Sequence, residues 1–274
     1  MSASLLEKMK NVKLSVLVVD IGGSKVKIKC TNSKVEKKFI SGPTMTPQMM
    51  VDGVKELAKG WHYDVVSIGC PMPVSKEGKP LKEPVNLAKG WVDFNYEAAF
   101  SCPVQMINDA AMQALGDYRG GRMLFLGLGT GLGSAMIEDG VILPMELAHL
   151  PYKKKTFEDY VGLHALKKYG KKKWQKEVLH IVEIFQAALQ PEKTVLGGGN
   201  AQILTAIPLG CTVAANSNAF IGGFRLWEHF PGQLRAIPKS TKKRTPSFKR
   251  ASKKSTNIRK PSLKAALASR SSHK

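Results

Sequence analysis

Short apolar runs recur along this chain, and each of them ends in small or polar residues. Runs of this kind, rich in β-branched side chains, are typical of buried strands. They predict strands at residues 13–19, 64–69, 104–107, 123–129 and 193–196. Segments with the apolar spacing of amphipathic helices lie between them, at residues 46–60, 110–118 and 171–189. Strands that alternate with helices predict an α/β fold.

Capping residues place the ends of several helices. Thr46 is the expected N-cap of the first helix, Pro47 its first residue and Gly60 its end. Thr156 is the expected cap of a helix in the second half of the chain, with acidic residues in its first turn. A further helix is expected at residues 201–207, directly behind the last strand.

The first strand runs into a turn whose residues suit phosphate. An acid, two glycines, a hydroxyl and a lysine follow the strand, namely Asp20, Gly22, Gly23, Ser24 and Lys25. Glycines let an anion approach the backbone amides, and a carboxylate can hold Mg2+ through water. The alternating residues 26–30 then predict a strand returning in a hairpin. A plain glycine hairpin accounts for the same residues, so this turn alone does not decide between the two interpretations.

Two more glycine runs follow predicted strands. Glycine occupies every second position from Gly127 to Gly133, with the hydroxyl of Thr130 among them, and the segment behind it predicts another hairpin. A glycine triplet follows the last strand, where a phosphate or a large flat group can lie close to the backbone: Gly197, Gly198 and Gly199.

Polar side chains outside the glycine runs supply further candidates. Asp109 stands where a strand gives way to a helix, a place where ligands gather in open α/β sheets, although it could also be a helix N-cap. Glu146 and His149 share one side of any helical turn, as a hydrogen-bonded pair, a metal pair or a surface coincidence. The loop from Asn86 to Trp91 offers an amide and an aromatic wall to a hydroxyl-rich ligand, or holds a structural tryptophan.

The formal net charge of +21 is concentrated at one end of the chain. Of the 42 Lys and Arg residues, 14 lie in residues 235–274, which contain no Asp or Glu; this leaves 28 basic and 21 acidic residues in the other 234. Residues 235–274 consist mainly of Lys, Arg, Ser, Thr and Pro and contain few apolar residues, so this segment is expected to be disordered. It is either an interaction arm for polyanions or a solubilising tail.

Cysteine usage and hydropathy indicate a cytoplasmic protein. Four cysteines are scattered without any CxxC pair, so neither a zinc site nor a disulfide framework is expected. No apolar run approaches about 18 residues, and the first residues lack the apolar core of a signal peptide. We therefore expect no membrane anchor.

Taken in order, the segments DIGGSK, NLAKGW, INDA, GLGTGLGSA, ELAHL, FEDYVG and LGGGN resemble the ROK family of sugar kinases, especially its glucokinases and polyphosphate glucokinases. The resemblance covers about residues 14–227. It implies the two-lobed, actin-like ATPase fold of the ribonuclease H-like type, with a central cleft where sugar and phosphoryl donor meet. The expected parts are an N-terminal lobe, a C-terminal lobe and a tail, at residues 1–108, 109–234 and 235–274.

The resemblance also implies a role for each motif. Asp109 corresponds to the base that accepts the proton of the sugar 6-hydroxyl. Sugar contacts are implied for Asn86, Asn108, Glu146, His149 and Glu158. Donor phosphates are expected at Asp20, Gly22, Gly23, Ser24 and Lys25, and at Gly129, Thr130, Gly131 and Gly133. The resemblance implies that Gly197, Gly198 and Gly199 form the motif for the adenosine or the far end of the donor. A Mg2+ requirement is implied, with the ion near Asp20, bound through water.

Three departures from the family pattern change the expected site. PYKKKT replaces the cysteine-rich zinc motif of many members, so no zinc is expected at His149. Ala148 stands where the family motif ExGH has glycine. Met72 lies in the proline-containing turn that follows the strand predicted at residues 64–69, at a position where glycine is common in the family. None of these changes removes the catalytic acid.

The expected function is phosphorylation of glucose at its 6-hydroxyl by ATP or polyphosphate, with the basic tail free to contact polyanions. One alternative is a kinase for another hexose, such as mannose or an N-acetylhexosamine. Another is a non-catalytic sugar sensor or nucleic-acid-binding protein on the same fold, against which Asp109 and the phosphate turns argue. Homodimers are common among similar proteins, and a dimer is compatible with this chain.

Overall fold

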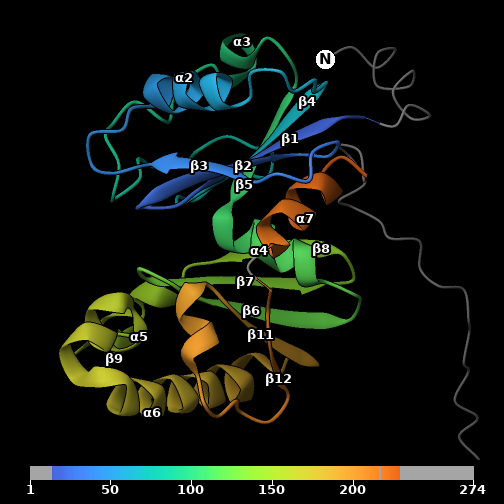
Figure 1. Ribbon diagram of the computed structural model, residues 1–274. Helices are drawn as coiled ribbons and strands as arrows, with labels where there is room; N and C mark the ends of the chain where they lie inside the picture. The colour runs from blue at the N-terminus through green and yellow to red at the C-terminus, as the bar shows by residue number, and fades with distance from the viewer. Residues whose placement is uncertain (1–13, 216, 229–274) are drawn as a thin grey trace, which may run out of the picture. The chain divides into compact units, whose positions relative to one another are not determined.

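The computed structural model describes residues 14–215 and 217–228 (Figure 1). The basic segment at residues 235–274 lies outside the described residues. The described chain forms two five-stranded sheets, which confirms the α/β prediction. Within this part of the chain, no helix combines the length and the apolar character that crossing a membrane requires.

The first sheet has the strand order β3-β2-β1-β4-β5. Its strands are β1 (Val16–Ile21), β2 (Lys25–Cys30), β3 (Lys37–Ile40), β4 (Val65–Cys70) and β5 (Val104–Asn108). The first three strands form an antiparallel meander, which confirms the predicted hairpin, and β4 and β5 continue parallel to β1. The carboxyl ends of β1, β4 and β5 therefore lie side by side.

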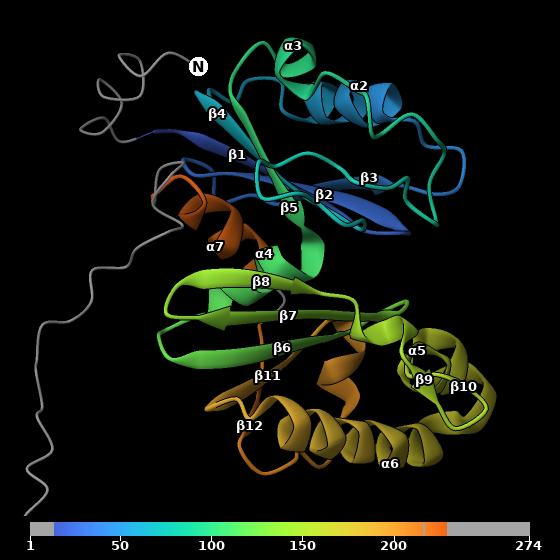
Figure 2. The ribbon, with the colours of Figure 1, turned by 180° about the vertical axis from the view of Figure 1, so that it is seen from behind.

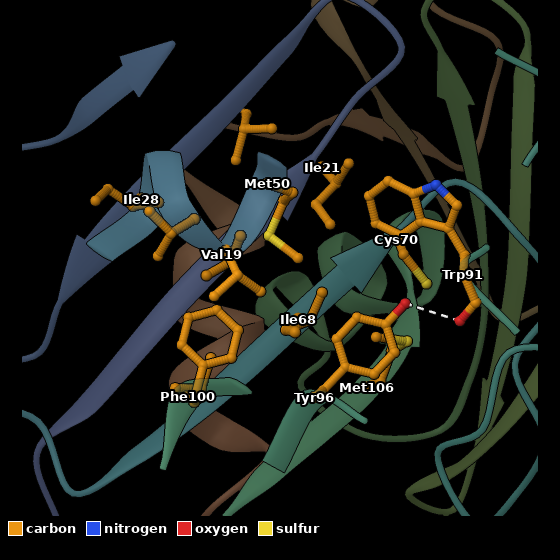
Figure 3. Close-up of a cluster of buried hydrophobic side chains, with 14 of the residues drawn as sticks. Val19, Ile21, Ile28, Met50, Ile68, Cys70, Trp91, Tyr96, Phe100 and Met106 are labelled. Atoms are coloured by element: carbon orange, nitrogen blue, oxygen red, sulfur yellow. Dashed lines mark hydrogen bonds between the residues drawn. The ribbon is translucent and has the colours of Figure 1, made fainter. Parts of the chain in front are cut away.

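An apolar core covers one face of this sheet beneath α2 (Pro47–Leu57) and α3 (Tyr96–Phe100). Thr46 caps α2 by accepting the Met49 N–H, as the sequence predicts, although the helix ends at Leu57, before Gly60. Figure 3 shows Trp91 inside this core, fully buried, with its carbonyl oxygen accepting the Tyr96 hydroxyl at 2.9 Å. The structural interpretation of Trp91 is therefore correct, and the aromatic wall for a ligand is wrong.

The second sheet has the strand order β12-β11-β6-β7-β8. Its strands are β6 (Arg122–Leu128), β7 (Leu132–Glu138), β8 (Val141–Met145), β11 (Lys193–Gly197) and β12 (Cys211–Val213). The pair β6–β7 is the second predicted hairpin, and β11 and β12 run parallel to β6. Helix α6 (Leu163–Leu189), interrupted at Gly170, packs its apolar side on this sheet (Figure 2).

Short elements connect β8 to α6: η1 (Leu147–His149), β9 (Pro151–Tyr152), β10 (Lys155–Thr156) and α5 (Glu158–Val161). The prediction of Thr156 as N-cap is off by one residue, because Phe157 occupies the N-cap position of α5, without a side-chain hydrogen bond to the helix. Thr156 instead donates its N–H and its hydroxyl to the Asp159 carboxylate, at 3.0 and 2.7 Å. The Asp159 carboxylate therefore binds Thr156, which precedes α5, and stabilises the start of this helix.

The expected helix at residues 201–207 is wrong. The chain forms only the 3₁₀ helix η2 (Gly199–Ile203), and Leu204 already has extended backbone angles. The next amide, that of Thr205, donates to the Gln175 side chain on α6 at 2.7 Å, so it does not continue the helix. Pro208 follows and would interrupt a longer helix.

Helices α4 (Asp109–Asp117) and α7 (Asn218–Arg225) pack on each other, and α4 contacts strands of both sheets. Their backbones approach closely at two glycines: a side chain on Gly222 would collide with the Met112 carbonyl, and one on Gly116 with the Asn218 carbonyl. Helix α7 also lies against β1 and β4 (Figure 1). Ser67 of β4 donates its hydroxyl to the Gly223 carbonyl at 2.6 Å.

We predict that Gly222→Ala lowers the free energy of unfolding by about 1–3 kcal/mol, because the added methyl group forces α7 away from α4. Gly129→Ala is the control, since a side chain there would meet no atom within 4 Å. Urea-induced unfolding measures both values. Equal stability of the two variants would show that the helices do not depend on this close approach.

Candidate active site

Three neighbouring strands bring the predicted acids together. In the register of the first sheet, Asp20 pairs with Gly69 on β4, and Gly69 pairs with Ile107 on β5. Asp20, near the end of β1, and Asp109, directly after β5, therefore lie at the same edge of the sheet. This is the carboxyl edge, where open α/β sheets bind their ligands.

Asp109 is the first residue of α4 and has a pKa raised to about 7. Burial is the largest cause, followed by the negative charge of Asp20 and, more weakly, that of Glu146. The Ala110 N–H opposes the rise by donating to the Asp109 carboxylate at 2.8 Å. The residue keeps an intermediate solvent exposure. A reachable carboxylate that titrates near neutral pH suits proton transfer at that pH.

Asn108 is the N-cap of α4, which leaves Asp109 free of that task. The Asn108 side-chain oxygen accepts the N–H groups of Ala110 and Ala111, at 3.0 and 3.3 Å. Its amide nitrogen donates to the Met72 carbonyl at 3.3 Å. The N-cap of α4 is therefore Asn108 and not Asp109. Within the described residues, one N–H of the Asn108 amide has no acceptor and is available to a ligand. The Met72 side chain points into the core.

The first glycine turn closes through a hydrogen bond from the Gly22 N–H to the Lys25 carbonyl, at 2.9 Å. The Gly23 and Ser24 amides donate to no acceptor in the described part of the chain, so both are available to an anion. Asn86 lies against this turn: a side chain on Gly23 would sit 3.6 Å from the Asn86 Cβ. The structure therefore brings the predicted sugar loop and the first phosphate turn together.

Asp20 lies beneath this turn and is almost completely buried. Burial raises its pKa, and the ammonium group of Lys27, 3.7 Å from its carboxylate, lowers it by less. Hard divalent cations favour one or two carboxylates combined with phosphate oxygens. Asp20 with Asp109 beside it fits a Mg2+ ion held mainly by phosphates. In the described residues, no group of three or more His, Cys, Asp or Glu is arranged to hold a metal by itself.

The second glycine turn, between β6 and β7, is braced by Glu158. Its carboxylate accepts the Leu132 N–H at 3.0 Å and fills the space that a side chain on Gly131 would need. On the other side, a Cβ on Gly133 would lie 2.9 Å from the Ala110 Cβ, so this turn packs directly on the start of α4. Glu158, expected to contact the sugar, therefore contacts the second glycine turn.

The third glycine run lies beside the second turn, because Gly197 pairs with Gly127 across β11 and β6. Asn200, which sequence reasoning did not select, donates its side-chain amide to the Gly129 carbonyl at 2.9 Å. Some glycines are needed for packing: Gly197 lies against the Phe125 ring and Gly198 against the Leu128 carbonyl. By contrast, a Cβ on Gly129 or Gly199 would meet no atom within 4 Å. Open space therefore adjoins these two glycines, as a donor would require.

Glu146 and His149 form a pair on η1, with 3.8 Å between the His149 Nε2 and a Glu146 carboxylate oxygen. Burial raises the pKa of Glu146, and the charge of Glu158 adds to the rise, whereas His149 and Lys82 oppose it. Since Glu146 also acts on Asp109, the carboxylates of Asp20, Asp109, Glu146 and Glu158 form a connected series from both sheets.

Glu83 holds the loop that carries Asn86, and sequence reasoning also missed it. Its carboxylate accepts the N–H groups of Gly90, Trp91 and Val92, at 3.1, 3.0 and 3.5 Å. Three successive backbone donors on one carboxylate fix the loop between Glu83 and Val92. No local pattern signals this role, because it depends on how the loop folds back.

Two sheets with glycine turns around a strand-end acid agree with the two-lobed fold that the sequence resemblance implies. The model of the ROK family matches residues 16–144. This part of the chain is similar to the ROK family of sugar kinases.

Individual relatives are distant in sequence. A polyphosphate glucokinase from Mycobacterium tuberculosis is 24% identical over 202 residues, covering 66% of this chain and 76% of that protein. The crystal structure of the inorganic polyphosphate/ATP-glucomannokinase from Arthrobacter sp. strain KM matches with a TM-score of 0.68 and 21% identity, over 78% of this chain and 98% of that one. A ROK family glucokinase from Streptomyces griseus, in complex with glucose and AMPPNP, matches with a TM-score of 0.62 and 16% identity, over 77% and 98%. These structures share the fold.

We predict that Asp109→Asn stabilises the protein at pH 8 by at least about 1 kcal/mol. The folded-state pKa of about 7 exceeds the ordinary value of 3.8, so ionising Asp109 costs folding free energy. That cost is absent near pH 4, where the folded carboxyl is protonated, and complete above pH 7. Urea unfolding at both values measures it, with Asp117→Asn at the other end of α4 as control. A stability difference that is equal at pH 4 and pH 8 would contradict the assignment.

Proposed function

We propose that this protein transfers a phosphoryl group from polyphosphate or ATP to the 6-hydroxyl of glucose, with Asp109 as general base. The position of Asp109 carries the proposal. It is an accessible carboxylate with a pKa of about 7, at the carboxyl edge of the first sheet and next to the glycine turns. Asn108 performs the capping task that would otherwise explain an acid at this place.

The sugar would bind among polar groups that converge from both sheets: Asn86, Asn108, Asp109, Glu146, His149 and Glu158. The contacts of two of these residues with the glycine turns indicate how the group is arranged. Asn86 adjoins the first glycine turn, and Glu158 touches the second. A hydroxyl held near Asp109 would thus lie between two backbone turns able to receive phosphate. The names of the Mycobacterium and Streptomyces proteins, and the glucose bound to the latter, support glucose as the sugar.

The donor would lie over the glycine turns, where several amides and two open glycines are available. Among the residues that the structure describes, the Gly23 and Ser24 amides have no acceptor, and open space adjoins Gly129 and Gly199. Gly131, Gly133, Gly197 and Gly198 shape these turns by close packing. When bound, Mg2+ would neutralise phosphate charge, with Asp20 as its protein partner through water.

We propose residues 1–108 and 109–234 as the two lobes of the protein. We also propose that the protein is located in the cytoplasm.

Asp109 would accept the proton of the attacking hydroxyl as the phosphoryl group is transferred. In phosphoryl transfer the protein mainly positions the reactants and stabilises charge. Because the Asp109 pKa lies near neutral pH, the carboxylate is present at that pH and is also basic enough to take the proton. The nearby negative charges of Asp20 and Glu146 increase its basicity.

We expect the purified full-length chain to form glucose 6-phosphate from glucose and Mg2+ with polyphosphate, with ATP, or with both. A coupled assay for glucose 6-phosphate tests each donor separately, and mannose and N-acetylglucosamine are tested in parallel by following donor consumption. Turnover of another hexose in place of glucose would correct the substrate. Absence of turnover with every sugar and donor would contradict the proposal.

Replacing Asp109 by Asn should lower kcat about 10²–10⁴-fold, because the general base is lost while the shape of the site is kept. Calorimetric titration with glucose should give a Kd within about threefold of wild type, since an amide still forms hydrogen bonds. Asp117→Asn, on the same helix but away from the turns, should retain wild-type kcat. Near-normal kcat in Asp109→Asn would exclude it as the base.

A further inference from the structure

One stretch of α6 carries an unusual density of positive charge. Within residues 167–176 six lysines are exposed, and no ion pair joins any of them to an acid in the described chain: Lys167, Lys168, Lys171, Lys172, Lys173 and Lys176. After the interruption at Gly170, Lys172 and Lys173 lie four and three residues from Lys176, so these lysines repel one another on the helix surface and destabilise it. A bound polyanion would remove this repulsion.

Hydrogen bonds at two points of α6 connect this helix to the glycine turns and to the chain that follows them. At the start of α6, the Leu163 N–H donates to the Thr130 carbonyl of the second glycine turn at 3.1 Å. Farther along, the Gln175 side-chain oxygen accepts the amide and the hydroxyl of Thr205, at 2.7 and 3.0 Å. Thr205 follows η2, which begins at Gly199. The helix is therefore attached to the chain that leaves both open glycines.

Contacts of Gln175 and Glu177 distinguish the side of α6 that faces Thr205 from the side that faces the β9–β10 hairpin. Lys171 and Lys172 precede Gln175 by four and three residues, so they share the side of α6 that faces Thr205. Lys173 shares a side with Glu177, whose carboxylate accepts the Tyr152 hydroxyl at 3.2 Å and pairs with Lys153 at 2.7 Å. That side faces the β9–β10 hairpin. Lys172 and Lys173, adjacent and both exposed, thus point toward different surroundings.

We propose that Lys171 and Lys172 bind the part of a long phosphate chain that extends beyond the glycine turns, so that inorganic polyphosphate is the donor this surface fits. The inference rests on the proposed function. A row of unpaired cations matches a ligand with a charge on every repeating unit. A nucleotide carries its charge only on a short phosphate group, and its base would be recognised by apolar or stacking contacts.

The test compares two double variants with the same change in charge. Lys171→Glu/Lys172→Glu alters the proposed surface, and Lys154→Glu/Lys173→Glu alters the hairpin side. In the full-length protein at low salt, the first pair should raise KM for long-chain polyphosphate about tenfold and flatten its dependence on salt concentration. The KM values for tripolyphosphate, ATP and glucose, and kcat itself, should stay within about twofold of wild type. The second pair should behave as wild type.

A binding measurement separates this inference from the proposed function. Fluorescently labelled long-chain polyphosphate is titrated into each full-length variant without sugar, and circular dichroism confirms that both variants are folded. Weaker binding only in the Lys171/Lys172 variant supports the surface, even if no sugar is phosphorylated. Equal weakening in both variants, or no weakening in either, overturns it, because charge alone or another segment would then account for binding.

Discussion

The contact between Gly133 and Ala110 holds the two parts of the candidate site together. It joins the second glycine turn to the first turn of α4, one residue beyond the proposed base. Since no larger residue fits at Gly133 without displacing Ala110, the distance between the acid and the turn is set by backbone packing. Asn108 strengthens the arrangement by capping α4 and donating to the Met72 carbonyl. The other contacts of the site, including those of Glu158 and Asn200, extend from this junction.

The raised pKa of Asp109 makes the residue a stronger base but lowers the stability of the folded protein when the carboxylate is charged. Negative charges from both sheets surround Asp109, and burial adds to their effect, so the charged form is the unfavourable one in the folded protein. A carboxylate made unfavourable in this way is a stronger base than one in water. Cations are positioned at the periphery, with Lys27 beside Asp20 and Lys82 near Glu146. The uncompensated charge in the centre would favour the binding of a cation together with phosphate.

The sequence allowed β1, β2, β4, β5, β6, β7 and β11, both hairpins and the first helix to be predicted, because hydrophobic period and capping residues are local signals. The edge strands β3, β8 and β12 were not predicted. Asp109 could also be placed at a strand-to-helix boundary. The carboxylate of Glu83, the Asn200 contact and the bracing of the second turn by Glu158 could not be predicted, since each joins residues that are distant in sequence or depends on a loop folding back. The expected helix at residues 201–207 failed for the same reason: a side chain on α6 takes the amide of Thr205.

The hydrogen bond from Ser67 to the Gly223 carbonyl spans 156 residues, and it has a consequence for how the chain acquires its structure. The buried cluster on this face combines Val16 and Val18 from the first strand with Phe220 and Leu226 near the end of the described chain. During synthesis on the ribosome, the first sheet therefore exposes an apolar surface until residues 219–227 have emerged. Contacts of such long range slow folding, and exposed apolar surface favours aggregation. The nascent chain should thus need protection by chaperones longer than its small size suggests.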